Sequence, residues 1–120
     1  MARVLVVEDN PVNMMLMRKM LEYLGHEVAE CDDGAEAVSV VVSGGVDVVL
    51  MDCQLPGMDG LAATRPIRQA GVTVPVIAVT AESIMDRPDR FREAGMDAVL
   101  AKPVIMSELA EVLEKLSREQ

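Results

Sequence analysis

Five short strand-like runs, each followed by a longer segment with helix signals, constrain the fold of this chain more than any other feature of its sequence. The runs are Arg3–Val7, Glu27–Glu30, Val46–Met51, Val74–Val79 and Asp97–Leu100. Three of them contain VLVV, VDVVLM and VPVIAV, which are apolar on both faces, as is typical of strands buried inside a parallel sheet. Because parallel neighbours need a crossover connection, the alternation predicts an α/β fold in which five helices flank a five-stranded parallel sheet.

The segments between the runs carry residues that begin and end helices. Asn10 and Pro11 predict a helix start, and Gly25 predicts the end of that helix. The other expected helices span Asp33–Ser43, Asp59–Ala70, Ser83–Ala94 and Ser107–Arg118. The VSVVV stretch in the first of these favours a strand by propensity, but a strand there would leave no crossover, so we predict a helix. Pro66 is expected to kink its helix or break it early, because a mid-helix proline removes a hydrogen bond.

The length of 120 residues matches one compact domain, and no repeat, linker or low-complexity tract divides the chain. With 51% hydrophobic residues, the chain can bury a substantial core. We therefore expect a single domain over residues 1–120.

The charge of the chain is acidic and unevenly distributed. The net charge is −9, and residues 1–60 hold eleven of the twenty acidic residues but only three of the eleven basic ones. A field of this sign repels nucleic acid and anionic lipid, and Tyr23 and Phe91 are too few aromatic rings for base stacking. The apolar runs are too short to span a membrane, and Cys31 and Cys53 form no disulfide or zinc motif. We expect a cytoplasmic protein that neither binds nucleic acid nor inserts into a membrane.

Polar side chains stand at the ends of four predicted strands. They are Glu8 and Asp9 after the first strand, Asp52 at the end of the third, Thr80 after the fourth and Lys102 after the fifth. In an open parallel sheet, groups at the carboxyl ends of the strands gather at one edge. Any one of these residues alone fits a helix cap or a solvated loop, but the five together indicate a functional site.

The chemistry of these side chains indicates phosphoryl transfer. Three clustered carboxylates repel one another unless a cation compensates their charge, and hard oxygen ligands suit Mg²⁺. Lys102 and Thr80 offer an ammonium and a hydroxyl donor to an anion beside the metal. In such a site a carboxylate can act as the nucleophile and form an acyl phosphate, and Asp52 is the candidate.

Four segments resemble the motifs of response-regulator receiver domains of two-component signalling. They are VLVVEDN at 4–10, VVLMDCQLPGMDG at 48–60, VIAVTA at 76–81 and GMDAVLAKP at 95–103. The resemblance covers the whole chain and implies a flavodoxin-like, doubly wound (βα)5 fold with strand order 2-1-3-4-5. By the same resemblance, Asp52 is the phosphoacceptor, Thr80 the switch hydroxyl, Lys102 the phosphoryl contact, and the Lys102–Pro103 peptide is cis. The Mg²⁺ ligands it implies are Glu8, Asp9, Asp52 and the backbone carbonyl of Gln54.

The resemblance also implies a biological role. The chain is expected to act as a phosphoacceptor signalling switch of a two-component phosphorelay, catalysing only its own phosphorylation and dephosphorylation. The implied partners are a sensor histidine kinase or a histidine phosphotransfer protein, and a downstream protein. A monomer is expected, and dimerisation on phosphorylation stays open, as does the choice between a stand-alone regulator and a receiver excised from a hybrid kinase.

Two positions around the expected site invite specific expectations. Receivers commonly carry Tyr or Phe three residues before the lysine, where this chain has Val99. Switching is therefore expected to rely on loop and backbone movement around Thr80–Arg87 or on a surface that does not involve a buried ring. Pro56-Gly57 and Asp59-Gly60 are expected to form the loop after the acceptor strand, where glycine permits unusual backbone conformations.

Three alternatives stay open at this point. A haloacid-type phosphatase also forms an aspartyl phosphate, but that family has a second aspartate two residues after the nucleophile, where this chain has Gln54. A flavodoxin-like flavin carrier would need a Ser/Thr-rich phosphate loop after the first strand. A degenerate receiver would bind partners without phosphorylation, and the complete set of acids, threonine and lysine argues against it.

Overall fold

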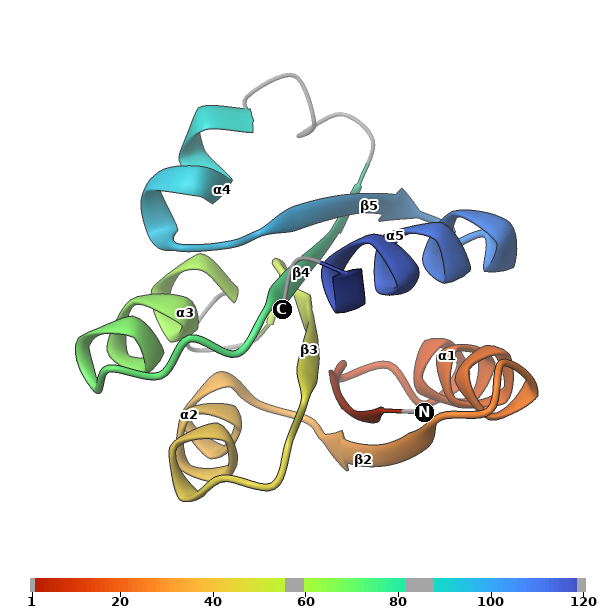
Figure 1. Cartoon of the computed structure of the whole chain (residues 1–120), viewed down its shortest axis with the longest axis horizontal. Helices are drawn as coiled ribbons and strands as arrows, with labels where there is room; N and C mark the ends of the chain where they lie inside the picture. The colour runs from red at the N-terminus through yellow and green to blue at the C-terminus, as the bar shows by residue number, and fades with distance from the viewer. Residues whose placement is uncertain (1, 56–59, 82–87, 119–120) are drawn as a thin grey trace.

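A five-stranded parallel sheet forms the centre of the protein (Figure 1). The computed structural model describes residues 2–55, 60–81 and 88–118. The strands are β1 Arg3–Val7, β2 Glu27–Cys31, β3 Val48–Asp52, β4 Val76–Ala81 and β5 Ala98–Lys102. Their order is β2-β1-β3-β4-β5. The predicted fold class and strand order are confirmed.

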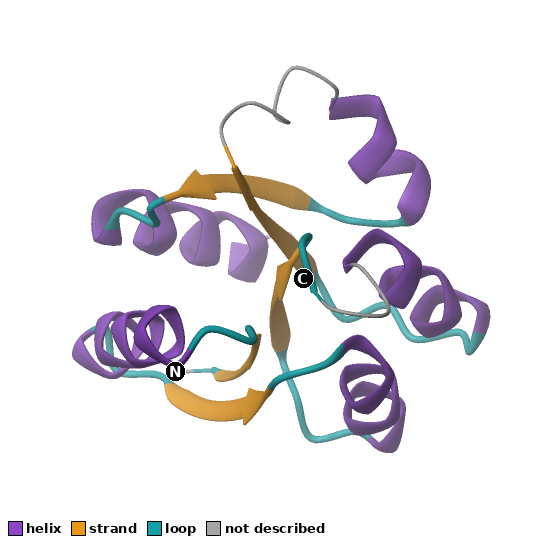
Figure 2. Ribbon diagram, turned by 180° about the vertical axis from the view of Figure 1, so that it is seen from behind, coloured by secondary structure: helices purple, strands orange, loops and turns teal. Residues whose placement is uncertain are grey.

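Helices cover both faces of the sheet (Figures 1 and 2). They are α1 Pro11–Tyr23, α2 Gly34–Ser43, α3 Gly60–Gln69, α4 Pro88–Ala94 and α5 Met106–Arg118. Helices α1 and α5 pack on one face, while α2, α3 and α4 pack on the other. The alternating strand residues Val4 and Val6 face the first layer, and Leu5 and Val7 face the second. Among the described helices, none combines the length and apolar character needed to cross a membrane.

Side-chain caps explain where the first two helices begin. The side chain of Asn10 accepts hydrogen bonds from the backbone N–H groups of Val12 and Asn13, and proline occupies the first turn of α1. Asp33 caps α2 by accepting from the N–H of Glu36 at 2.7 Å. The valine-rich α2 is therefore a helix, as predicted, because its cap and its buried face outweigh β propensity.

The last three strands end one or two residues later than the sequence indicated. Strand β3 ends at Asp52 rather than Met51, β4 at Ala81 rather than Val79, and β5 at Lys102 rather than Leu100. The reason is ladder pairing, because Asp52 pairs with Val79, and Ala81 pairs with Lys102. The polar residues expected after these strands are thus held inside them, which fixes their backbones.

Helix α3 continues past Pro66 to Gln69, so an early break is excluded, while the alternative, a kink at Pro66, stays a prediction. The carbonyl of Pro66 still accepts a hydrogen bond from the N–H of Ala70, and Thr64 and Ile67 anchor the helix in the core. For helix α4, the described part begins at Pro88, and the expected start at Ser83 lies outside the described residues. The same holds for the expected start of α3 at Asp59.

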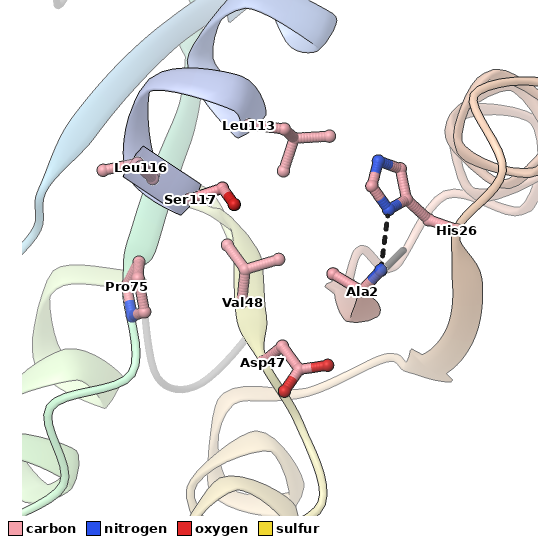
Figure 3. Close-up of a pocket in the computed structure, with 8 residues that line it drawn as sticks. All are labelled: Ala2, His26, Asp47, Val48, Pro75, Leu113, Leu116 and Ser117. Atoms are coloured by element: carbon pink, nitrogen blue, oxygen red, sulfur yellow. Dashed lines mark hydrogen bonds between the residues drawn. The ribbon is translucent and has the colours of Figure 1, made fainter. Parts of the chain in front are cut away.

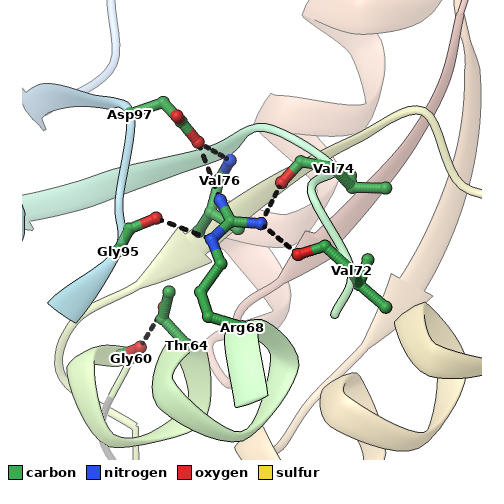
Figure 4. A network of polar contacts seen from close by, with 8 residues as sticks. All are labelled: Gly60, Thr64, Arg68, Val72, Val74, Val76, Gly95 and Asp97. Carbon is green, nitrogen blue, oxygen red and sulfur yellow. Dashed lines mark hydrogen bonds and ion pairs between the residues drawn. The ribbon is translucent and has the colours of Figure 1, made fainter. Parts of the chain in front are cut away.

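Arg68, on α3, ties three segments together at the amino ends of β4 and β5 (Figure 4). Its guanidinium donates at 2.7–2.9 Å to the carbonyl oxygens of Val72, Val74 and Gly95 and to the carboxylate of Asp97. Asp97 also accepts from the backbone N–H of Val76 at 2.8 Å. The guanidinium group of Arg68, with its several donors, thereby links α3 to the loops that precede β4 and β5.

Candidate functional site

The five polar side chains singled out from the sequence lie at the carboxyl edge of the sheet. Glu8 and Asp9 follow β1, whereas Asp52 and Lys102 are the last residues of β3 and β5, and Thr80 is the penultimate residue of β4. Because β1, β3, β4 and β5 are consecutive in the sheet, their carboxyl ends are neighbours.

Three carboxylates form the acidic part of the site. One oxygen from each of Glu8, Asp9 and Asp52 lies within 4.8 Å of the others. Glu8 is 2% exposed and Asp52 is 1% exposed, whereas Asp9 faces solvent. Two carboxylates buried this deeply need compensating charge or hydrogen bonds.

Lys102 supplies a positive charge to the two buried acids. Its Nζ atom lies 3.1 Å from Asp52 Oδ2 and 3.6 Å from Glu8 Oε1. Burial by itself lowers the pKa of Lys102, but the two carboxylates outweigh this, so its pKa is raised above the ordinary value. Lys102 is therefore a cation at neutral pH.

Backbone donors orient the other oxygen of each buried acid. The N–H of Gln54 donates to Asp52 Oδ1 at 2.9 Å, and the N–H of Asn10 donates to Glu8 Oε2 at 3.2 Å. Each carboxylate is thus fixed from one side by the chain that follows its strand. The second oxygen of each faces the shared space near Lys102.

Two buried oxygen atoms of the site have no hydrogen-bond partner among the described residues, Glu8 Oε1 and Thr80 Oγ1. The pKa of Glu8 is raised, chiefly because of burial and also because of neighbouring Asp52. Buried polar atoms without partners are costly, so such atoms in one cluster indicate a ligand. Hard oxygen donors with surplus negative charge fit Mg²⁺, and a free hydroxyl beside Lys102 fits an anion.

Gly60, at the start of α3, packs against the end of β3. A Cβ atom there would collide with the backbone oxygen of Asp52 and lie 2.8 Å from Cγ of Met51. Its φ is not positive, so close packing, rather than the expected backbone freedom, excludes a side chain. Nothing in the sequence alone signals this contact, and the expected loop at residues 56–59 lies outside the described residues.

Two further expectations concern the last strand. The Lys102–Pro103 peptide is cis, as the resemblance implied. Val99 is half-buried and packs on the side of the sheet that α2, α3 and α4 cover. Most of the expected switching segment, residues 82–87, lies outside the described residues, so that expectation stays a prediction.

Two cavities border different ends of the sheet. One of about 280 Å³ lies at the amino ends of the strands and is lined by His26, Asp47, Pro75 and the end of α5 (Figure 3). Another, of about 300 Å³, lies beside the acidic site and is lined mainly by apolar residues of α1 and by Val104. The first cavity is remote from the acidic site of Glu8, Asp9 and Asp52, because it lies at the opposite ends of the strands.

Comparisons with known proteins agree with this geometry. The family model described as "Response regulator receiver domain" matches residues 4–114. The chain is 40% identical over 110 residues to sensor histidine kinase RcsC of Escherichia coli K12. This match covers 92% of this chain but 12% of that protein. The chain is also 40% identical over 118 residues to sensor protein GacS of Pseudomonas syringae pv. syringae, covering 94% of this chain and 13% of that protein.

Solved structures of receiver domains have the same fold. The receiver domain of sensor histidine kinase PA1611 from Pseudomonas aeruginosa PAO1, with a magnesium ion coordinated in its active site cleft, is 41% identical with a TM-score of 0.85. The match covers 95% of each chain. The receiver domain of histidine kinase CKI1 from Arabidopsis thaliana, complexed with Mg²⁺ and BeF₃⁻, is 35% identical with a TM-score of 0.86, covering 98% of this chain and 90% of that one. From the acidic edge of the sheet, the matched motifs and these relatives together, we conclude that the chain belongs to the response regulator receiver domain family.

Proposed function

We propose that this domain is a phosphoacceptor switch in which Asp52 takes a phosphoryl group from a phosphohistidine. The donor would be a sensor histidine kinase or a histidine phosphotransfer protein, and the phosphorylated form would present a changed surface to a downstream protein. The domain would span residues 1–120, act in the cytoplasm and catalyse only its own phosphorylation and dephosphorylation.

The observation that carries this proposal is the way Asp52 is held. Its carboxylate is buried, receives the N–H of Gln54 on one oxygen and faces Lys102 with the other. A nucleophile in this position is oriented before its substrate arrives, which lowers the entropic cost of reaction. The unpartnered hydroxyl of Thr80 adds a donor on the neighbouring strand.

Three carboxylates would hold the metal, those of Glu8, Asp9 and Asp52, together with the backbone carbonyl of Gln54. Oε1 of Glu8, which accepts no hydrogen bond from the described residues, supports this assignment. When bound, Mg²⁺ supplies positive charge that offsets the carboxylates and the phosphoryl oxygens.

The transfer itself exchanges one bond to phosphorus for another. A carboxylate oxygen of Asp52 forms a bond to phosphorus while the P–N bond to the donor imidazole breaks. The bonding electron pair stays on the imidazole nitrogen, and the product is an acyl phosphate on Asp52. Lys102 and Thr80 would hold the oxygens of the transferred group through an ammonium and a hydroxyl donor.

Phosphorylation by a small donor tests the proposal without knowledge of the partner. The protein would be incubated with ³²P-labelled phosphoramidate and MgCl₂, and acid-labile protein-bound label would be counted. Wild type is expected to incorporate label, and Asp52→Asn or added EDTA should abolish it. Asp47→Asn is the matched control, because Asp47 is an exposed acid just before the other end of β3. Full labelling of Asp52→Asn would refute the assignment.

A further inference from the structure

A groove between α3 and α4 shares no lining residue with the acidic site at the sheet edge and has its own chemical character. It encloses about 500 Å³ and is lined by Leu61, Ala62, Arg65, Pro66, Gln69, Arg90 and Glu93. We call this the α3–α4 groove. None of these residues belongs to the site at the carboxyl edge, so the proposed function does not account for it.

Two arginines dominate the charge of the α3–α4 groove. Arg65 and Arg90 are exposed, and neither forms an ion pair or a side-chain hydrogen bond within the described part of the chain. Four other cations are paired: Arg18 with Glu30, Arg68 with Asp97, Arg118 with Glu114 and Lys102 with Asp52. Further exposed cations, such as Arg92 and Lys115, also lack an ion pair among the described residues, but only Arg65 and Arg90 line this groove.

Helix α3 contributes no acidic residue to this groove. Helix α3, GLAATRPIRQ, contains two arginines and no acidic residue, whereas each of the other four helices contains at least one Asp or Glu. Among the described residues, Glu93 on α4 is the one acid in the lining. Most of the acidic surplus lies in residues 1–60, on other elements. The groove is therefore a basic surface on an acidic domain.

The walls of the groove are fixed relative to each other. Arg68, about one turn along α3 from Arg65, donates to the carbonyl of Gly95, the residue that follows α4 (Figure 4). The half-buried Leu61 and Pro66 contribute apolar surface between the charged groups. The groove thus combines a partly apolar lining with two guanidinium groups that have no partner among the described residues, between helices whose ends are linked through Arg68.

From these contacts we infer that the α3–α4 groove binds an acidic segment of a partner protein. Carboxylates of that segment would pair with Arg65 and Arg90, and a small apolar side chain between them would pack on Pro66. Arginine suits this task because its planar group binds a carboxylate with two parallel hydrogen bonds.

Charge argues for a partner protein over two other occupants. Nucleic acid carries a dense negative charge, which Glu93 and the net charge of −9 oppose. A second copy would bring another −9 and its own acidic cluster, Asp32, Asp33 and Glu36. That contact would join two different surfaces and so would not close into a dimer. A short acidic segment brings few charges, and salt screens the rest of the domain beyond about 8 Å.

Titration with a defined peptide tests the inference. The probe is a fluorescein-labelled peptide in which Glu-Glu pairs alternate with Leu. It is added to the whole chain in physiological salt, and the chemical shifts of the backbone amides are followed by NMR. Shifts are expected at residues 61–69 and 90–93, and the glutamine version of the peptide should cause none. Arg65→Gln and Arg90→Gln should each weaken binding about tenfold. The matched control is Arg92→Gln, which removes an exposed arginine of α4 that does not line the groove.

Several results would overturn the inference. They are an absence of shifts at millimolar peptide, an equal loss of affinity in Arg92→Gln, and preferential binding of an RNA oligonucleotide to the groove. Concentration-dependent self-association that Arg65→Gln removes would instead identify a second copy as the occupant. Labelling of Asp52 is expected to be unchanged in all three arginine variants, so failure here is distinguishable from failure of the proposed function.

Discussion

The ammonium nitrogen of Lys102 lies 3.1 Å from Oδ2 of Asp52, although the two residues end strands that are separated by β4. The cation that faces the acids of the first half of the chain therefore comes from near its end. Strands β1, β3, β4 and β5 must therefore be assembled before Lys102 offsets part of the negative charge of the site.

Lys102→Gln should destabilise the protein at neutral pH. The change leaves Glu8 and Asp52 buried without a cation, so we expect the free energy of unfolding to fall by about 1–3 kcal/mol. Urea denaturation measures this, and MgCl₂ should restore more stability to the variant than it adds to wild type. Lys115→Gln, an exposed site on α5, is the control. Equal losses in the two variants would contradict a compensating role for Lys102.

Two fully buried threonines should respond differently to replacement by valine. Thr64 Oγ1 donates to the carbonyl of Gly60 at 2.8 Å, whereas Thr80 Oγ1 has no partner among the described residues. Thr64→Val should therefore lose about 1 kcal/mol, while Thr80→Val should keep or gain stability without Mg²⁺ and phosphodonor. Thermal and urea unfolding of both variants measure the difference. A loss in Thr80→Val as large as that in Thr64→Val would show that its hydroxyl is already bonded.

Gly60→Ala should impair phosphorylation of Asp52 beyond its effect on stability. The new methyl group would push against the backbone oxygen of Asp52, displacing the end of β3 or the start of α3. Overpacking of this kind costs about 1–3 kcal/mol. Ala63→Val adds volume to the buried core from the same helix and serves as the control. At matched folded fraction, the labelling rate should fall more in Gly60→Ala, and equal rates would remove Gly60 from the positioning of Asp52.

His26 should make the protein less stable in mild acid. Its Nδ1 accepts the backbone N–H of Ala2 at 3.0 Å (Figure 3), and burial lowers its pKa below the ordinary 6.5. The unfolded chain then binds a proton on His26 more readily than the folded protein does. The contribution of neutral His26 to the free energy of unfolding is therefore fully present above the ordinary pKa, and it is lost as the pH falls through the lowered pKa of the folded state. Urea midpoints between about pH 7.5 and about pH 5.5 should fall less in His26→Gln than in wild type. Parallel curves for the two proteins would exclude His26 as the source.

Much of the fold was predictable because the physical signals were local. Val4 to Val7 and Val48 to Met51 are apolar on both faces, and only a sheet covered on both sides buries such strands. Asn10 and Asp33 predict helix starts, because their side chains cap the turn that follows. The grouping of Glu8, Asp52 and Lys102 then follows from a rule of parallel sheets, because strands in one direction bring their ends to one edge.

Other features depended on contacts between distant segments. Nothing around Arg68 in the sequence indicates that it binds the carbonyl of Gly95, and the persistence of α3 past Pro66 depends on its buried neighbours. The predicted ends of β4 and β5 were wrong because the polar side chains of Thr80 and Lys102 suggest loop residues, whereas the backbones of both residues stay in the ladder. The close approach of Gly60 to Asp52 likewise exists only after α3 packs on the sheet.

The Arg68 network sets a mechanical asymmetry in the sheet. It holds β4 and β5 where they begin, near Val76 and Asp97, whereas Thr80 and Lys102 stand near their far ends. The amino ends of β4 and β5 are therefore tied to α3 by side-chain contacts as well as by ladder pairing, whereas Thr80 and Lys102 are held at the other end by the ladder.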